Sequence, residues 1–185
     1  MKTKVGVMGS AGDILSSVTS NLVSTRAESL GRAIAANDVV LFTGATTGIV
    51  YLVGKTARDS GAFHVGISPA SHLLEHTERY RLPADACDVL VYTGFGLKGR
   101  NVVLVRSCDI VLFIAGAMGS LNEFSIAHDE GKVIGCLTQT GGVADEADYL
   151  IEKFSKQTGA EIVQDADPEK LLKHCLFKLA QRQAR

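Results

Sequence analysis

Short apolar runs alternate along the chain with longer stretches in which apolar residues recur at helical spacing. The short runs predict strands at residues 5–8, 39–42, 63–67, 89–92, 110–114 and 133–137, with another near Ile162. The longer stretches predict helices over residues 19–36, 49–60, 100–106, 121–130, 145–157 and 168–181. Asp165 or Asp167 can cap the last helix, and Pro168 suits its first position. The irregular segment 68–86 could carry a short helix and act as a lid or an interface element.

The predicted strands are apolar throughout rather than alternating between apolar and polar residues. Such strands are covered on both faces, as in a parallel sheet flanked by helices. The regular alternation of strand and helix indicates the same arrangement. We therefore expect an α/β fold: a three-layer, Rossmann-like, doubly wound and mainly parallel sheet with helices on both faces. A length of 185 residues suits a single domain that spans residues 1–185.

Composition and charge narrow the classes of partner. The formal net charge is −1, which argues against a protein that wraps a nucleic-acid backbone, so no nucleic-acid partner is expected. No apolar stretch is long enough for a membrane span, and no signal-peptide core follows Met1. The cysteines are far apart and form no CxxC pair, which fits small buried side chains in a reducing cytoplasm; they are Cys87, Cys108, Cys136 and Cys175.

Three glycine-rich loops each follow a predicted strand and lead toward a helix; they are residues 9–12, 44–48 and 116–120. In a parallel sheet these loops emerge at the same edge, where ligands of doubly wound folds bind. Glycine lets a ligand approach the backbone, and the amides of the following helix favour phosphate. The loops also carry hydroxyl donors, at Ser10, Thr46, Thr47 and Ser120. The pattern predicts a crevice for a phosphate-bearing small molecule.

The loops match neither of the common nucleotide motifs in full. No lysine follows Gly48, which disfavours ATP hydrolysis of the P-loop kind, and GxGxxG is incomplete, which disfavours an ordinary dinucleotide dehydrogenase. His72 and His76 have the spacing of a helical metal-binding pair, but a third ligand is missing. We therefore expect no metal site and no required cofactor, with a bound nucleotide as the ligand.

Residues 115–123, Ala-Gly-Ala-Met-Gly-Ser-Leu-Asn-Glu, resemble the PGGxGTxxE motif of the LOG ("lonely guy") family of Rossmann-like nucleotide-binding proteins. The resemblance extends over most of the chain: residues 9–11 resemble the family's GSS turn, 43–48 its GGGxxGLM loop and 61–69 its GxVxGVxP strand. The chain departs from the family at Ala115 and Ala117, which replace proline and glycine, and around Arg100, where the MHxRK context is absent.

The resemblance implies a nucleoside 5′-monophosphate phosphoribohydrolase that releases base and ribose 5-phosphate. It assigns catalysis to Arg100 and Glu123, since a carboxylate can stabilise an oxocarbenium-like sugar and an arginine can grip phosphate or ribose. The nucleotide- and phosphate-binding residues that it implies are Gly9, Ser10, Gly44, Ala45, Thr46, Thr47, Gly48, Gly116, Ala117, Met118, Gly119, Ser120 and Asn122. It also implies a homodimer or a higher homo-oligomer.

Other interpretations of the same residues remain open. The crevice could belong to a non-catalytic carrier or sensor of a nucleotide or of molybdenum cofactor, or to an interaction module with a vestigial site. Arg100 could be a surface residue at a helix N-terminus, and Glu123 could serve only to favour the first turn of its helix.

Overall fold

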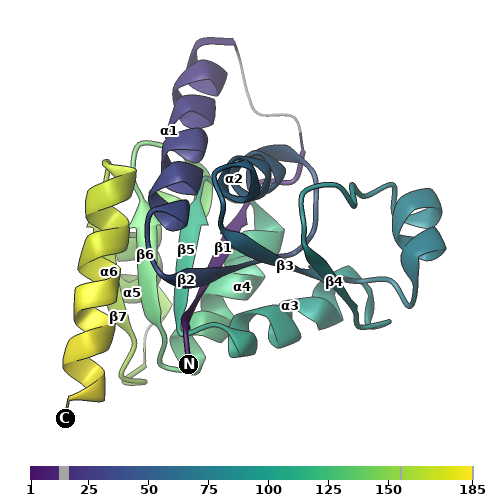
Figure 1. Ribbon diagram of the computed structural model, residues 1–185. Coiled ribbons are helices and arrows are strands. Elements are labelled where there is room, and N and C mark those ends of the chain that lie inside the picture. The colour runs from purple at the N-terminus through teal and green to yellow at the C-terminus, as the bar shows by residue number, and fades with distance from the viewer. Residues whose placement is uncertain (13–16, 155, 185) are drawn as a thin grey trace.

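The computed structural model describes residues 1–12, 17–154 and 156–184, and it contains one seven-stranded sheet (Figure 1). The strand order is β4-β3-β2-β1-β5-β6-β7, and every neighbouring pair is parallel. The strands are β1 (Thr3–Gly9), β2 (Val39–Thr43), β3 (Phe63–Ser68), β4 (Val89–Tyr92), β5 (Ile110–Ile114), β6 (Val133–Leu137) and β7 (Glu161–Asp165). The chain builds outward from β1 to β4 and then returns to place β5 on the other side of β1. The carboxyl ends of β1 and β5 are therefore the switch point where doubly wound folds bind ligands.

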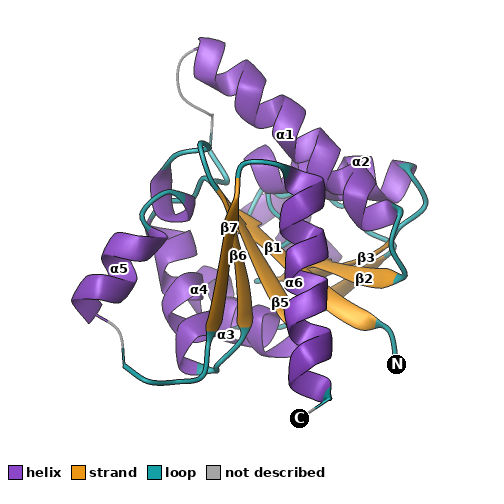
Figure 2. Cartoon of the chain, turned by 90° about the vertical axis from the view of Figure 1, so that its left-hand side faces the viewer, coloured by secondary structure: helices purple, strands orange, loops and turns teal. Residues whose placement is uncertain are grey.

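Helices cover both faces of this sheet (Figure 2). They are α1 (Ser17–Ala35), α2 (Gly48–Asp59), α3 (Gly96–Ser107), α4 (Met118–Asp129), α5 (Ala147–Phe154) and α6 (Pro168–Gln183). One buried cluster joins α1, α2 and α6 to the sheet, and a second joins α3, α4 and α5 to its other face. In β5, Ile110, Leu112 and Ile114 belong to the first cluster, whereas Val111 and Phe113 belong to the second. The expected three-layer, doubly wound α/β fold is confirmed.

Several predicted helix ends were wrong. Helices expected to start at residues 100 and 121 begin at Gly96 and Met118, because their first turns carry glycines and little of the apolar periodicity. The helix expected over 145–157 is the shorter α5, preceded by a single 3₁₀ turn at Gly142–Ala144. In α1, Leu22 is 49% exposed, whereas the neighbouring Val23 is buried.

The segment between β3 and β4 carries one short helix, of the π type, at Glu75–Arg79. Its His76 is fully buried: Nδ1 contacts the Ser68 hydroxyl at 2.8 Å, and Nε2 donates to the Pro83 carbonyl at 3.0 Å. Both ring nitrogens are therefore committed to protein partners, which leaves neither for the His72–His76 metal pair considered above.

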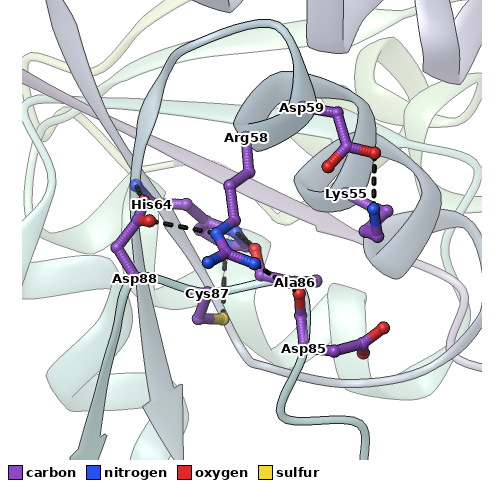
Figure 3. A network of polar contacts seen from close by, with 8 residues as sticks. All are labelled: Lys55, Arg58, Asp59, His64, Asp85, Ala86, Cys87 and Asp88. Atoms are coloured by element: carbon purple, nitrogen blue, oxygen red, sulfur yellow. Dashed lines mark hydrogen bonds and ion pairs between the residues drawn. The ribbon is translucent and has the colours of Figure 1, made fainter.

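A second buried histidine ties the end of this segment to the sheet (Figure 3). His64 Nδ1 donates to the Ala86 carbonyl at 2.5 Å, and Nε2 accepts from the Thr43 hydroxyl at 2.8 Å. Burial lowers the pKa of His64 to about 4, so the ring is neutral. Nearby, Arg58 Nε donates to Asp88 at 3.0 Å. This network holds the segment in place, and through Thr43 it reaches the loop after β2, since the Thr43 hydroxyl also accepts from the Ala45 amide at 3.2 Å.

Candidate functional site

A cleft of about 310 Å³ opens at the carboxyl ends of the central strands. It is bounded by the loops after β1, β2 and β5 and by the first turns of α3 and α4. Its lining residues are Val7, Met8, Gly9, Ser10, Ala11, Gly12, Gly44, Thr46, Val50, Leu97, Lys98, Arg100, Asn101, Ala117, Gly119, Ser120 and Glu123. Two lining side chains are basic and one is acidic. The cleft thus lies at the switch point between β1 and β5.

The three glycine-rich loops hold one another in register. The Ser10 hydroxyl accepts a hydrogen bond from the Gly116 amide at 3.1 Å. The Ser10 carbonyl accepts from the Ile49 amide at 3.1 Å, and the Thr47 hydroxyl donates to the Ala11 carbonyl at 2.5 Å. Ser10 therefore links the loop after β1 to both of its neighbours. A Cβ at Gly48 would lie 2.5 Å from the Ser10 carbonyl oxygen, so this close approach requires glycine.

Most of the residues predicted from the sequence line the cleft, but six do not. Those that line it are Gly9, Ser10, Gly44, Thr46, Arg100, Ala117, Gly119, Ser120 and Glu123. Those outside the lining are Ala45, Thr47, Gly48, Gly116, Met118 and Asn122. The Met118 side chain is 74% exposed, and Thr47 and Gly48 instead border a separate hollow next to Tyr51. Several of these six shape the loops rather than face the cleft.

Two of the alanines that replace family glycine or proline have left-handed backbone conformations. Ala45 has φ +48° and Ala115 has φ +53°. For residues other than glycine this region costs about 1–2 kcal/mol. Both are buried directly beside the cleft loops. Both alanines therefore tolerate a left-handed turn in spite of the methyl group, and at position 115 proline could not adopt it, because its ring fixes φ near −65°.

The N-terminus of α4 faces the cleft without a capping side chain. Ala117 occupies the N-cap position, and Gly119 and Ser120 of the first turn line the cleft. By contrast, α6 is capped by Asp167, which accepts hydrogen bonds from the Glu169 and Lys170 amides. First-turn amides carry partial positive charge and bind anions when no side chain occupies them. The start of α4 is therefore suited to phosphate, as is the start of α3, which also has no capping side chain and lines the cleft through Leu97 and Lys98.

Arg100 and Glu123 meet at the base of the cleft. Arg100 Nη1 donates to Glu123 Oε1 at 3.3 Å, and the two residues are 7% and 6% exposed. Arg100 is thus not a surface residue, and Glu123 lies in the second turn of α4 rather than the first, since that helix begins at Met118. The alternative interpretations of both residues are wrong.

Gly44 makes this position of Arg100 possible. A Cβ at residue 44 would overlap the Arg100 guanidinium at Nη1, Cζ and Nη2. The guanidinium therefore lies flat against the backbone of the loop after β2. Among the described residues, Arg100 Nε is the buried side-chain polar atom without a hydrogen-bond partner. Since this atom is also sealed from solvent, a ligand could accept from it only after the side chain moves.

Burial dominates the electrostatics of this pair. Burial raises the pKa of Glu123 to about 7, and the positive charges of Arg100 and Lys98 oppose that shift. Burial likewise lowers the pKa of Arg100, and Glu123 opposes that shift. Near neutral pH, Glu123 therefore exchanges between carboxylate and carboxylic acid. A buried carboxyl that titrates near neutrality, in a cleft and beside an arginine, is typical of a functional site.

Two polar side chains of the lining were missed by the sequence analysis, and they belong to Lys98 and Asn101. Asn101 is buried beside Glu123, and with its amide nitrogen turned toward that residue it donates to Oε1 at 3.0 Å. Lys98 is exposed at the rim of the cleft, close enough to lower the pKa of Glu123. Both lie beside Arg100 in a stretch that departs from the family motif, so no motif marked them. The one available signal was their position, within one helical turn of Arg100.

None of the four cysteines lines this cleft. All are buried, and burial raises the pKa of each thiol to about 12. They act as small core residues rather than as nucleophiles. Over the described parts of the chain, no helix is sufficiently long and apolar to cross a membrane.

Comparison with known proteins supports a shared fold along the whole chain. The solved structure of TM1055 is 28% identical, with a TM-score of 0.81 over 95% of this chain and 99% of that one. The molybdenum cofactor binding protein from Rippkaea orientalis is 22% identical, with a TM-score of 0.73 over 100% and 99%. DNA processing protein A from Helicobacter pylori, described by its single-stranded DNA binding, is 16% identical with a TM-score of 0.61 over 95% and 81%. The last two likenesses show the fold alone.

A curated protein from Archaeoglobus fulgidus is 31% identical over 108 residues, which is 58% of this chain and 66% of that protein. A family model, the SLOG cluster4 family, matches residues 2–172. The resemblance to LOG proteins is thereby confirmed at the level of the superfamily that includes them. Because the family model covers most of its length, the chain belongs to the SLOG cluster4 family.

Proposed function

We propose that the cleft binds a nucleotide-like small molecule through its phosphate. The observation that carries this proposal is the first turn of α4, which has no capping side chain and faces a 310 Å³ cleft. The Ser10 and Ser120 hydroxyls and the Lys98 ammonium group lie in the same lining and add donors for phosphate oxygens. The Arg100 guanidinium adds positive charge at the base of the cleft, next to Glu123.

For the chemistry, we propose hydrolysis of the N-glycosidic bond of a nucleoside 5′-monophosphate. The bond from C1′ of the ribose to the base breaks with its electron pair on the base, and a water oxygen bonds to C1′ as a proton reaches the base nitrogen. The Glu123 carboxylate orients this water and stabilises the positive charge that develops on the sugar. Arg100 anchors the ribose or the phosphate. Since Glu123 must be ionised, the rate should rise as the pH increases through about 7.

A panel of nucleoside 5′-monophosphates, assayed for release of ribose 5-phosphate, tests this reaction. Glu123→Gln should abolish release. Glu130→Gln is the matched control, because Glu130 ends the same helix and pairs with Arg106 at the surface. Hydrolysis is refuted if no nucleotide releases ribose 5-phosphate, or if Glu123→Gln releases it as fast as the wild type. Calorimetric titration of the same panel tests binding separately.

The second candidate is a carrier that holds a phosphate-bearing cofactor without cleaving it. The molybdenum cofactor binding protein from Rippkaea orientalis shares this fold. The lining fits the phosphate end of such a cofactor, through the start of α4 and Lys98. It offers no cysteine to the metal, so the cofactor would be held through its pterin and phosphate. Native mass spectrometry of freshly purified protein, together with thermal shifts against pterins and nucleotides, tests this candidate. An empty protein with no shift refutes it.

Three further predictions remain proposals. We propose a homodimer in the cytoplasm, with no nucleic-acid partner. Apolar side chains exposed on the edge strand β4 and at the start of α3 support self-association; they are Val89, Val91, Tyr92 and Phe95. The likeness to a DNA processing protein makes the nucleic-acid prediction worth testing. Light scattering would report the oligomeric state, and fluorescence anisotropy with labelled single-stranded DNA would report nucleic-acid binding.

A further inference from the structure

The two oxygens of the Glu123 carboxylate have different surroundings. Arg100 Nη1 lies 3.3 Å from Oε1, and the Asn101 amide nitrogen lies 3.0 Å from the same oxygen. No described residue donates to Oε2, yet Oε2 is not among the sealed polar atoms that lack a partner. Since Glu123 lines the cleft, Oε2 is the oxygen that opens to it. The carboxylate is therefore held by one oxygen and free at the other.

Asn101 is itself fixed in place on three sides. It is 3% exposed and lies on α3 directly after Arg100. Its amide nitrogen also donates to the Leu97 carbonyl at 3.0 Å, one turn earlier in α3. Its amide oxygen then lies 2.8 Å from Asn122 Oδ1, so the Asn122 amide must be turned as well to donate to it through its nitrogen, and Asn122 precedes Glu123 in α4. The amide thus bridges α3 and α4 at the point where Glu123 enters the cleft.

We propose that Asn101 is a positioning residue that holds Glu123 by Oε1 and so presents Oε2 to the ligand. The use of Oε2 by a ligand rests on the proposed function, whereas the hydrogen bond to Oε1 does not. Arg100 alone does not fix the carboxylate, because a single donor at 3.3 Å leaves it free to rotate. The shorter bond from a buried amide removes that freedom. As a neutral donor, Asn101 does so without adding charge beside Arg100 and Lys98.

Titration of the ligand-free protein tests the hydrogen bond without any assumption about turnover. The carboxyl carbon of Glu123 is followed by ¹³C NMR against pH and is identified by its loss in Glu123→Gln. Asn101→Leu removes a donor that favours the charged form, so the pKa of Glu123 should rise by about 1 unit. Asn101→Asp keeps the shape and places a second carboxylate beside Glu123, so the pKa should rise further. Asn37→Asp, in the exposed turn after α1, makes the same charge change elsewhere and should leave the titration of Glu123 unchanged.

If both variants fold and Glu123 titrates in each of them at the same pH as in the wild type, the proposal is overturned. If Asn101→Leu does not fold, Asn101→Ala takes its place, because the charge of Asn101→Asp would raise the pKa of Glu123 with or without the hydrogen bond. The use of Oε2 is tested with whichever nucleotide the wild type hydrolyses: Asn101→Leu should lower kcat at least tenfold and change KM less than threefold. An unchanged kcat together with a shifted titration would refute that use while leaving the hydrogen bond established. Absence of turnover in the wild type would instead count against the hydrolytic function, and the titration would still judge Asn101.

Discussion

Gly44→Ala should displace Arg100 and leave Glu123 without its cationic neighbour. The backbone of Gly44 is not left-handed, so an alanine at this position would not be strained by its φ angle. Its Cβ would instead occupy the space of the Arg100 guanidinium. The guanidinium ends a flexible side chain and can move toward the cleft, but its contact with Glu123 Oε1 is lost when it does. The substitution therefore acts through one ion pair.

The size of the effect follows from the pKa of Glu123. That pKa is already about 7 because the carboxyl is buried, and Arg100 holds it below the value that burial alone would set. A nearby opposite charge lowers a carboxyl pKa by roughly 1–3 units. At pH 8.5 its loss is worth about 1–2 kcal/mol of stability, because each pH unit above a pKa of about 7 contributes at most about 1.4 kcal/mol. The cost should be small at pH 5.5, where Glu123 is protonated in both proteins, and should grow as the pH rises past 7.

Urea unfolding of wild type and Gly44→Ala at pH 5.5 and pH 8.5 measures this difference. A double-mutant cycle with Arg100→Ala supplies the control, because Gly44→Ala should cost less than about 0.5 kcal/mol once the guanidinium is gone. An equal cost at both pH values would refute the electrostatic reasoning. An equal cost with and without Arg100 would show that the methyl group clashes with something else.

Three further substitutions test residues that lie outside the lining of the cleft. In the folded protein the pKa of His64 is about 4, below its ordinary 6.5. Stability should therefore be lost as the pH falls from 6.5 to 4, by about 3 kcal/mol in total. Urea unfolding should show this dependence on pH in the wild type and not in His64→Gln. Asp167→Ala removes the cap of α6 and should cost about 1 kcal/mol in thermal unfolding, whereas Asp167→Asn should cost little. Ala115→Gly relieves a left-handed alanine and should stabilise the protein by up to about 1 kcal/mol against urea; a loss would mean that the buried methyl group contributes more than the strain costs.

Much of the fold was predictable because its signals are local. Uniformly apolar strands indicated burial on both faces, and glycine after a strand indicated loops at one edge. The approach of Arg100 to Glu123 was anticipated only through the resemblance to a family motif. Asn101 could not be assigned, because its role depends on where α3 begins and therefore on which way residue 101 points. The helix start was misplaced by four residues, from Gly96 to position 100.

The requirement for Gly44 was equally hidden from the sequence. A glycine in a tight turn usually serves the turn itself, and the glycine of this position was interpreted as space for a phosphate. The structure fills that space with the Arg100 side chain, which comes from a helix more than fifty residues later in the chain. Such a contact depends on the packing of α3 against the sheet. No local sequence pattern indicates the contact between Arg100 and Gly44.

The contrast between the cleft and the rest of the molecule argues against a vestigial site. Away from the cleft, polar groups are satisfied: Asp167 caps α6, and both ring nitrogens of His64 and of His76 have partners. At the cleft, the start of α4 has no capping side chain, Arg100 Nε has no acceptor, and a buried Glu123 is only partly ionised near neutral pH. Each of these costs stability in the free protein, and a bound anion would satisfy the free amides at the start of α4. Among the described residues, the buried side-chain polar atom without a partner lies in this cleft, which is what a binding site rather than a vestigial one would show.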